Sequence, residues 1–158
     1  MAARSFKSVG NKVSDSKFNR SVRDDPPLGI VTPLQFGTNR SGLFKMHFDN
    51  QAQVHDNLKN LLLTNHGERL GHYDFGSNLR ELTTERLSSK DFDNEAMLRI
   101  RDSVKKYMPY IDLSSFESSF NRSPNSDSVA EISIKIFYNI PKLQISNRGI
   151  EVVLFCIG

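Results

Sequence analysis

Hydrophobic residues in the middle of this 158-residue chain recur with helical spacing. Between residues 50 and 63 the positions i, i+4, i+7 and i+8 are filled by Val54, Leu58, Leu61 and Leu62. This spacing places them on one face of a helix. Asp49 or Asn50 can cap its first turn, and Gly67 has the tolerance for positive φ that a helix C-terminus favours.

Two further helices are predicted downstream. Leu79, Leu82 and Leu87 indicate a short one, and a longer one is expected from residue 91 to residue 108. Its core-facing stripe is predicted to be Met97, Ile100, Val104 and Tyr107. Pro109 marks the end of this helix, because proline cannot continue one.

The pattern then changes to a period of two, which is typical of strands. Residues 129–140 alternate apolar and polar positions, and residues 111–120 form a weaker strand connected to them by the turn-rich stretch 121–128. Residues 150–157 are apolar at both alternate sets of positions, and SNRG at 146–149 predicts a tight turn before them. Helices followed by an antiparallel hairpin and another strand predict an α+β fold.

The expected domain spans residues 49–158. It would hold a small antiparallel sheet of about three to four strands, with two to three helices packed against one face. Residues 1–48 are predicted to be an extended N-terminal arm, because they are rich in polar residues and prolines interrupt them. The first 50 residues carry five of the eleven phenylalanines. Such spaced anchors suit a segment that lies on its own domain or on a partner.

The last strand bears on function because both of its faces carry apolar residues that need to be covered. Ile150, Val152, Leu154 and Cys156 point one way, and the other face is formed by Glu151, Val153, Phe155 and Ile157. Either the arm or a partner is needed to cover the second face in so small a domain. If the strand lies at the sheet edge, it can also accept a strand from another chain.

Composition and charge exclude several classes of function. The net charge of +3 comes from residues 1–50, which carry eight Lys and Arg against four Asp. Because these cations are spaced out and interleaved with acidic residues, no nucleic-acid partner is predicted. No apolar run approaches the length of a membrane span, and the first residues lack the apolar core of a secretory signal. The single Cys156 allows no internal disulfide, which fits a reducing compartment.

The segment LLLTNHGERLGHYDFGSNLRELTTERL at residues 61–87 could be an active site or a structural elbow. Glycoside cleavage by Glu68 would need a second carboxyl about 5 to 9 Å away across a sugar cleft, and no spacing here requires one. His66 and His72 match no usual zinc pattern, and no phosphate-binding glycine loop is present. We therefore predict no catalytic residue, metal or cofactor. The elbow residues with a predicted structural role are Gly67, Glu68, Arg69, Phe75 and Gly76.

The order of these motifs resembles one family. An apolar helix, Gly-Glu-Arg, Phe-Gly and a leucine, followed by a helix, a Tyr-x-Pro-x-Ile-Asp segment and a β-hairpin, is similar to the gene-25-like baseplate wedge proteins of contractile-tailed phages. Their relatives include the type VI secretion component TssE. The resemblance covers roughly residues 27–157.

The resemblance implies a structural, non-enzymatic subunit of the virion, present in six copies per tail baseplate and assembled in the host cytoplasm. Its implied partners are other baseplate wedge proteins, through their helical core bundle, and the tail sheath protein, whose first ring docks by strand exchange. The implied bundle contacts are Tyr107, Met108, Pro109 and Tyr110. The family commonly has Glu-Pro-Arg where this chain has Met-Pro-Tyr, so contact there would be apolar instead of ionic. The implied sheath contacts are Glu151, Val153, Phe155 and Ile157. The alternatives are a peptidoglycan hydrolase using Glu68 and a type VI secretion subunit.

Overall fold

A computed structural model describes residues 27–37, 42–84, 89–122 and 129–157. The chain forms two compact units, Met1–Gln53 and Val54–Gly158. In the first unit, β1 (Gly29–Ile30) pairs antiparallel with β2 (Met46–His47), and a bridge joins Phe36 to Phe44. The rings of these two phenylalanines stack with centroids 6.5 Å apart.

The first long helix, α1 (Asn50–Leu63), begins at a side-chain cap. The Asp49 carboxylate accepts hydrogen bonds from the backbone N–H groups of Gln51 and Ala52, at 3.2 and 3.3 Å. Asp49 is therefore the capping residue of the two that the sequence offered. The buried residues of α1 are the predicted Leu58, Leu61 and Leu62.

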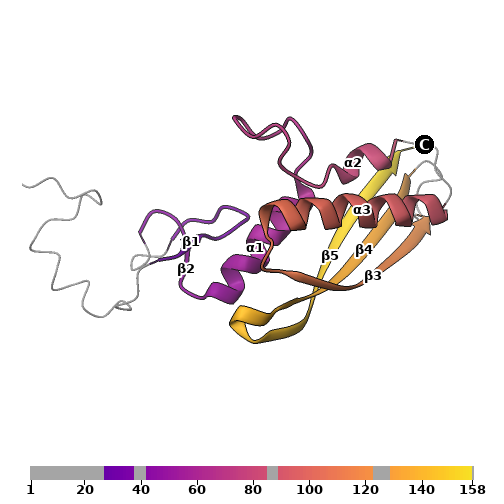
Figure 1. The fold of residues 1–158 in the computed structure, drawn as a ribbon. Helices are drawn as coiled ribbons and strands as arrows, with labels where there is room; N and C mark the ends of the chain where they lie inside the picture. The colour runs from indigo at the N-terminus through magenta and orange to yellow at the C-terminus, as the bar shows by residue number, and fades with distance from the viewer. Residues whose placement is uncertain (1–26, 38–41, 85–88, 123–128, 158) are drawn as a thin grey trace, which may run out of the picture. The chain divides into compact units, whose positions relative to one another are not determined.

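The second unit is an α+β fold, as predicted. Its sheet has the order β3–β4–β5 and is antiparallel throughout, formed by β3 (Asp112–Arg122), β4 (Val129–Ile140) and β5 (Ile145–Ile157). Figure 1 shows α1, α2 (Leu79–Leu82) and α3 (Ser89–Tyr107) beside this sheet. Leu87 of the predicted second helix lies outside the described residues.

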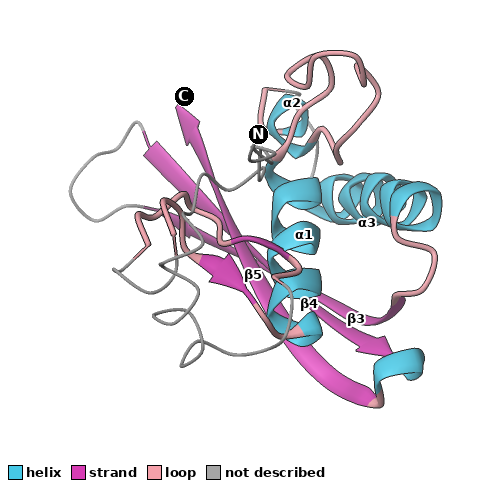
Figure 2. Ribbon diagram, turned by 90° about the vertical axis from the view of Figure 1, so that its left-hand side faces the viewer, coloured by secondary structure: helices cyan, strands magenta, loops and turns pink. Residues whose placement is uncertain are grey.

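The helices pack on one face of the sheet (Figure 2), and the core lies between them. The alternating residues of β4 supply its centre, each with at most 5% of its surface exposed: Ile132, Ile134, Ile136, Tyr138 and Ile140. The opposite face is largely polar. Glu117, Lys135 and Glu151 stand side by side across the three strands. This ladder of alternating charge allows that face to remain in contact with water.

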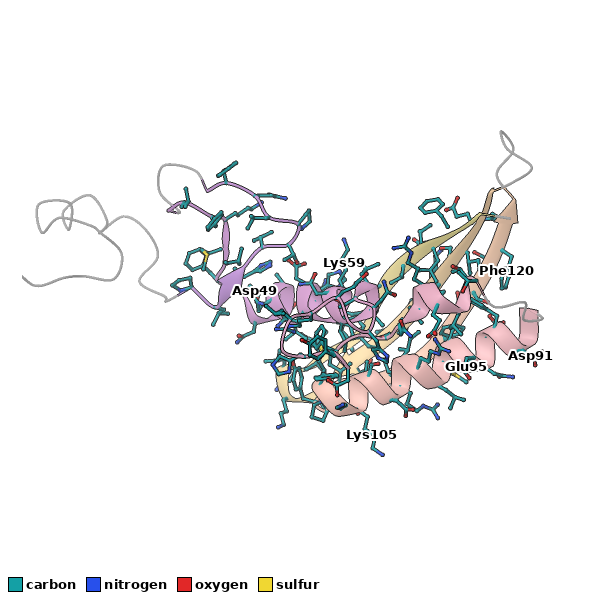
Figure 3. All side chains as sticks on the ribbon, turned by 90° about the horizontal axis from the view of Figure 1, so that it is seen from above. Asp49, Lys59, Asp91, Glu95, Lys105 and Phe120 are labelled. Carbon is teal, nitrogen blue, oxygen red and sulfur yellow. The ribbon has the colours of Figure 1, made fainter. Side chains whose placement is uncertain are left out.

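The core stripe of α3 differs from the prediction. Phe92, Ala96, Ile100 and Val104 are buried, whereas Met97 is 36% exposed. The four buried residues recur at i+4, and Met97 lies one position beyond that row. At the N-terminal end of α3, Phe92 packs edge-on against Phe120 of β3 with ring centroids 5.5 Å apart. Figure 3 shows Lys105 pointing away from the sheet at the other end of the helix.

The predicted turn at residues 146–149 is wrong. These residues lie inside β5, and the reversal occurs earlier, in the 3-10 helix η3 (Pro141–Leu143) and at Gln144, which has a φ of 54°. Pro141 favours the start of such a turn because its φ is already restricted. Gly149, which signalled a turn, instead faces Phe137, and a Cβ at this position would lie 3.3 Å from the phenyl ring.

Candidate functional site

The elbow between α1 and α2, residues 64–78, is held by its own backbone. Gly76 has a φ of +115°, and a Cβ at this position would lie 2.1 Å from the carbonyl oxygen of Thr64. Its carbonyl accepts hydrogen bonds from His66 Nε2 at 3.2 Å and from Ser103 Oγ of α3 at 2.8 Å. Only glycine fits this position, where the elbow returns against α1.

Gly67 serves the elbow and not the end of α1. The helix ends at Leu63, and Gly67 donates its N–H to the carbonyl of Tyr73 at 2.7 Å. Its φ is +85°. The hydrogen bond closes a small loop whose tip carries Leu70, which is 90% exposed.

Glu68 accepts hydrogen bonds from Asn65, which lies in the elbow two residues after the end of α1. Its two carboxylate oxygens accept hydrogen bonds from the backbone N–H of Asn65 at 2.8 Å and from the Asn65 side-chain amide at 2.9 Å. The backbone hydrogen bond, followed by the side-chain one, lowers the pKa of Glu68, and Arg80 acts in the same direction through space. These hydrogen bonds therefore favour the ionised form of the carboxyl.

Arg69 makes a separate contact from Glu68. Its guanidinium lies over the ring of Phe75, 4.3 Å from the centroid. Phe75 in turn meets Tyr107 of α3 edge-on, with centroids 4.9 Å apart, and packs against the core. These contacts connect the elbow to the C-terminal end of α3 through a cation–π and an aromatic pair.

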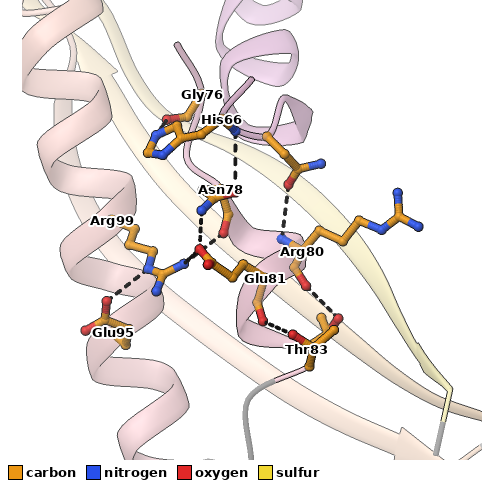
Figure 4. Close-up of polar contacts among 10 residues, drawn as sticks. His66, Gly76, Asn78, Arg80, Glu81, Thr83, Glu95 and Arg99 are labelled. Atoms are coloured by element: carbon orange, nitrogen blue, oxygen red, sulfur yellow. Dashed lines mark hydrogen bonds and ion pairs between the residues drawn. The ribbon is translucent and has the colours of Figure 1, made fainter. Parts of the chain in front are cut away.

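Two ionic contacts also join the elbow and α2 to α3. Asp74 pairs with Lys106, and the hydrogen bond from Lys106 is the largest of several effects that lower the pKa of Asp74 to about 2. Arg99 of α3 bonds Glu95 at 2.9 Å, Glu81 at 3.1 Å and the carbonyl of Asn78 at 3.1 Å (Figure 4). Arg99 was not among the residues predicted from the sequence, although its i, i+4 spacing from Glu95 was a usable signal.

Two segments that are far apart in the sequence, the elbow and residues 107–110, line one cleft of about 630 Å³. The elbow contributes Glu68, Arg69 and Phe75, and the end of α3 with the following turn contributes Tyr107, Met108 and Tyr110. The wall from α1 and its end consists of Asn57, Asn60, Leu61 and Thr64. The cleft is thus a polar and aromatic recess.

The residues of the predicted 107–110 contact differ in accessibility. Met108 is only 5% exposed and belongs to the core, whereas Tyr107 and Tyr110 are half-buried and Pro109 is exposed. Burial raises the pKa of the Tyr110 phenol. The two tyrosines therefore offer a partner more surface in the cleft than Met108 does.

The predicted contacts on β5 lie on the edge strand of the described sheet. Phe155 is 64% exposed and Val153 is half-buried. Glu151 is exposed, accepts a hydrogen bond from Ser133 Oγ and lies 3.9 Å from the Lys135 ammonium. The side chain of Ile157 lies outside the described residues.

A second recess, of about 430 Å³, adjoins this strand. It is lined by residues of β5, of α2 and of the end of α1, including Phe155, Arg80 and Leu63, and by Glu68 of the elbow. Glu68 therefore stands between the two recesses. In the described part of the chain, no group of three or more His, Cys, Asp and Glu side chains is arranged to hold a metal ion. None of its helices combines the length and the apolar composition of a membrane span.

A family model decides the relationship of the chain to known proteins. The model of "Baseplate wedge protein gp25" matches residues 49–142, which is more than half of the sequence. The chain belongs to the gp25 family of baseplate wedge proteins. Members of this family are structural components of contractile-tail baseplates, so the resemblance found in the sequence is confirmed. The match begins at Asp49, the cap of α1, and ends in η3. It therefore includes the elbow and residues 107–110, which line the cleft.

Two solved structures are similar to the gp25-family chain. One is a chain of the sixfold-symmetrised baseplate of the anti-feeding prophage, with a TM-score of 0.52 and 13% identity, covering 81% of this chain and 82% of the other. The other is a candidate tail lysozyme from Geobacter sulfurreducens, with a TM-score of 0.47 and 17% identity, covering 69% of this chain and 91% of the other. At 13% identity, the similarity to the baseplate chain of the anti-feeding prophage shows a shared fold. No curated protein matches the chain significantly.

Proposed function

We propose that this protein is a non-enzymatic junction of a contractile-tail baseplate, which joins the wedge core to the first sheath ring and initiates sheath assembly. The observation that carries the proposal is that one small unit has both a cleft and an edge strand that a partner can reach. One is the cleft lined by the elbow and residues 107–110, and the other is the edge of β5. We place the wedge neighbours at the cleft and a strand of the sheath protein at β5, in a particle with six copies.

The state of Glu68 supports a structural role over hydrolysis. A glycosidase needs one carboxyl that stays protonated to donate to the leaving group. The hydrogen bonds from Asn65 instead lower the pKa of Glu68. Among the residues lining the cleft, Glu68 is also the single carboxylate.

The sheath side is tested by Phe155→Asp in the producing particle, scored by electron microscopy of tails. Leu98→Asp is the matched control, because Leu98 is 50% exposed on α3. We expect baseplates without sheath for Phe155→Asp and complete tails for Leu98→Asp. Both purified variants should melt close to wild type, because both positions are exposed. Complete sheathed tails from Phe155→Asp would refute docking at β5.

The wedge side is tested by filling the cleft from an exposed helix position. Asn57→Arg places a long cation in the cleft, and Asn94→Arg makes the same change on the exposed side of α3. We expect wedge assembly to fail with Asn57→Arg and to proceed normally with Asn94→Arg.

The enzymatic alternative is tested by a peptidoglycan-degradation assay of wild type and Glu68→Gln. Lytic activity in wild type that disappears in Glu68→Gln would contradict the non-enzymatic proposal.

A further inference from the structure

The recess beside β5 has an apolar floor and a polar rim. Its floor includes Leu62 and Leu79, each 1% exposed, and its mouth carries Leu63 at 47% and Phe155 at 64% exposure. The residues of its rim are Asn65, Glu68, Arg80 and Thr83. Large apolar side chains at the mouth of such a recess can take up an apolar side chain from outside.

The recess adjoins β5, which is the edge strand of the sheet in the described part of the chain. Leu154 is paired in register with Ile132, which faces the helices, so Leu154 also points to the helical side. A strand added beside β5 would direct every second side chain to that same side. Those side chains would enter the recess between β5, α2 and the end of α1.

Arg80 gives the recess a charge requirement. Its side chain extends from α2 toward β5 (Figure 4), and among the described residues its guanidinium makes no hydrogen bond or ion pair. The nearby Glu68 carboxylate already accepts two hydrogen bonds from Asn65. A carboxylate on an incoming chain would supply the planar partner that a guanidinium binds best.

We infer that the recess selects the strand that pairs with β5, by accepting an apolar side chain together with a carboxylate two residues away. This inference rests on the proposed function, because it assumes that a strand is added at β5. The partner strand carries a leucine-sized anchor that enters the recess beside Leu63 and Leu154, and an Asp or Glu that reaches Arg80.

The test uses two synthetic ten-residue peptides and the full-length protein. Both peptides alternate Thr with Val and carry a central Leu, and they differ two residues further along, where one has Glu and the other has Lys. Binding is measured by fluorescence anisotropy with wild type, Arg80→Glu and Lys105→Glu. The last variant makes the same kind of charge change on the side of α3 that points away from the sheet.

The expected result is a preference that depends on Arg80. Wild type should bind the Glu peptide roughly five-fold more tightly than the Lys peptide, in line with a solvent-accessible ion pair. Arg80→Glu should reverse the preference, and Lys105→Glu should leave it as in wild type. Leu63→Asp should weaken both peptides about ten-fold, because it removes the apolar mouth.

N-methylated versions of the peptides separate this inference from the proposed function, because they lack backbone donors for strand pairing. If the Glu and Lys peptides bind equally and N-methylation abolishes both, strand addition stands and the selection by Arg80 is refuted. If the unmethylated peptides fail to bind even at millimolar concentration, the inference is also overturned. The sheath assay with Phe155→Asp would then decide the proposed function independently.

Discussion

Replacing Gly76 with alanine should be among the most damaging single-methyl changes in this fold. The added Cβ would lie 2.1 Å from Thr64 O and 2.7 Å from Thr64 C. Both distances are far inside the ~3.5 Å of an ordinary contact. Because Thr64 O is a backbone atom, no side-chain rotation can relieve the overlap, and the elbow must move away from the end of α1.

The expected cost combines backbone strain with lost hydrogen bonds. At a φ of +115°, a residue with a Cβ is strained. This strain costs about 1–3 kcal/mol of the free energy of unfolding. Moving the Gly76 carbonyl weakens its hydrogen bonds from His66 and Ser103, each contributing about 1 kcal/mol. We expect a total loss of about 4 kcal/mol in the free energy of unfolding, equivalent to a fall of roughly 15 °C in Tm.

Gly71→Ala is the matched control, because Gly71 also has a positive φ of +78° but no heavy atom lies within 4 Å of the place that its added methyl group would take. It should lose about 1–2 kcal/mol, from the left-handed backbone alone. Urea unfolding followed by circular dichroism at 222 nm measures both variants. Equal losses in the two variants, within about 0.5 kcal/mol, would show that the approach of Gly76 to Thr64 is not a constraint of the fold.

Three further predictions concern single interactions. Because the pKa of Asp74 is lowered to about 2 in the folded state, its stabilising effect is present above pH 4 and is lost as pH falls toward 2; Asp74→Asn should flatten the acid-unfolding curve in that window. Tyr138→Phe removes the 3.0 Å hydrogen bond to His55 and should cost about 1 kcal/mol in urea unfolding. Arg99→Lys keeps the charge but cannot bond both glutamates and a carbonyl together; hydrogen exchange in α2 should therefore accelerate about five-fold.

The pH dependence from His55 has the same sign as that from Asp74. Burial is the main cause that lowers the pKa of His55 below its ordinary value of 6.5. Its contribution to stability is therefore complete above pH 6.5 and is lost as pH falls through the lowered folded-state pKa. NMR titration of the imidazole measures this directly, and a folded-state pKa at or above 6.5 would contradict the burial argument.

The sequence alone determined the main helices and strands of the second unit, apart from the start of β5. The alternation from Ile132 to Ile140 and the leucines of α1 are local patterns that specify one buried face each, and the structure buries those faces. Pro109 marked the end of α3 within two residues. The order of these elements and the Gly-Glu-Arg and Phe-Gly motifs also identified the family.

The tertiary structure decided where the turn before β5 lies and which residues share a recess. Gly149 resembles a turn residue locally, but pairing with β4 extends the strand through it, and Phe137 fills the space beside it. Phe75 and Tyr107 are 32 positions apart in the sequence and meet only because α3 packs beside the elbow. Periodicity reports which face of an element is buried, and carries no information about the partner that buries it. The cleft, the recess beside β5 and the position of Arg80 depend on such long-range packing, because each is formed by residues from separate elements.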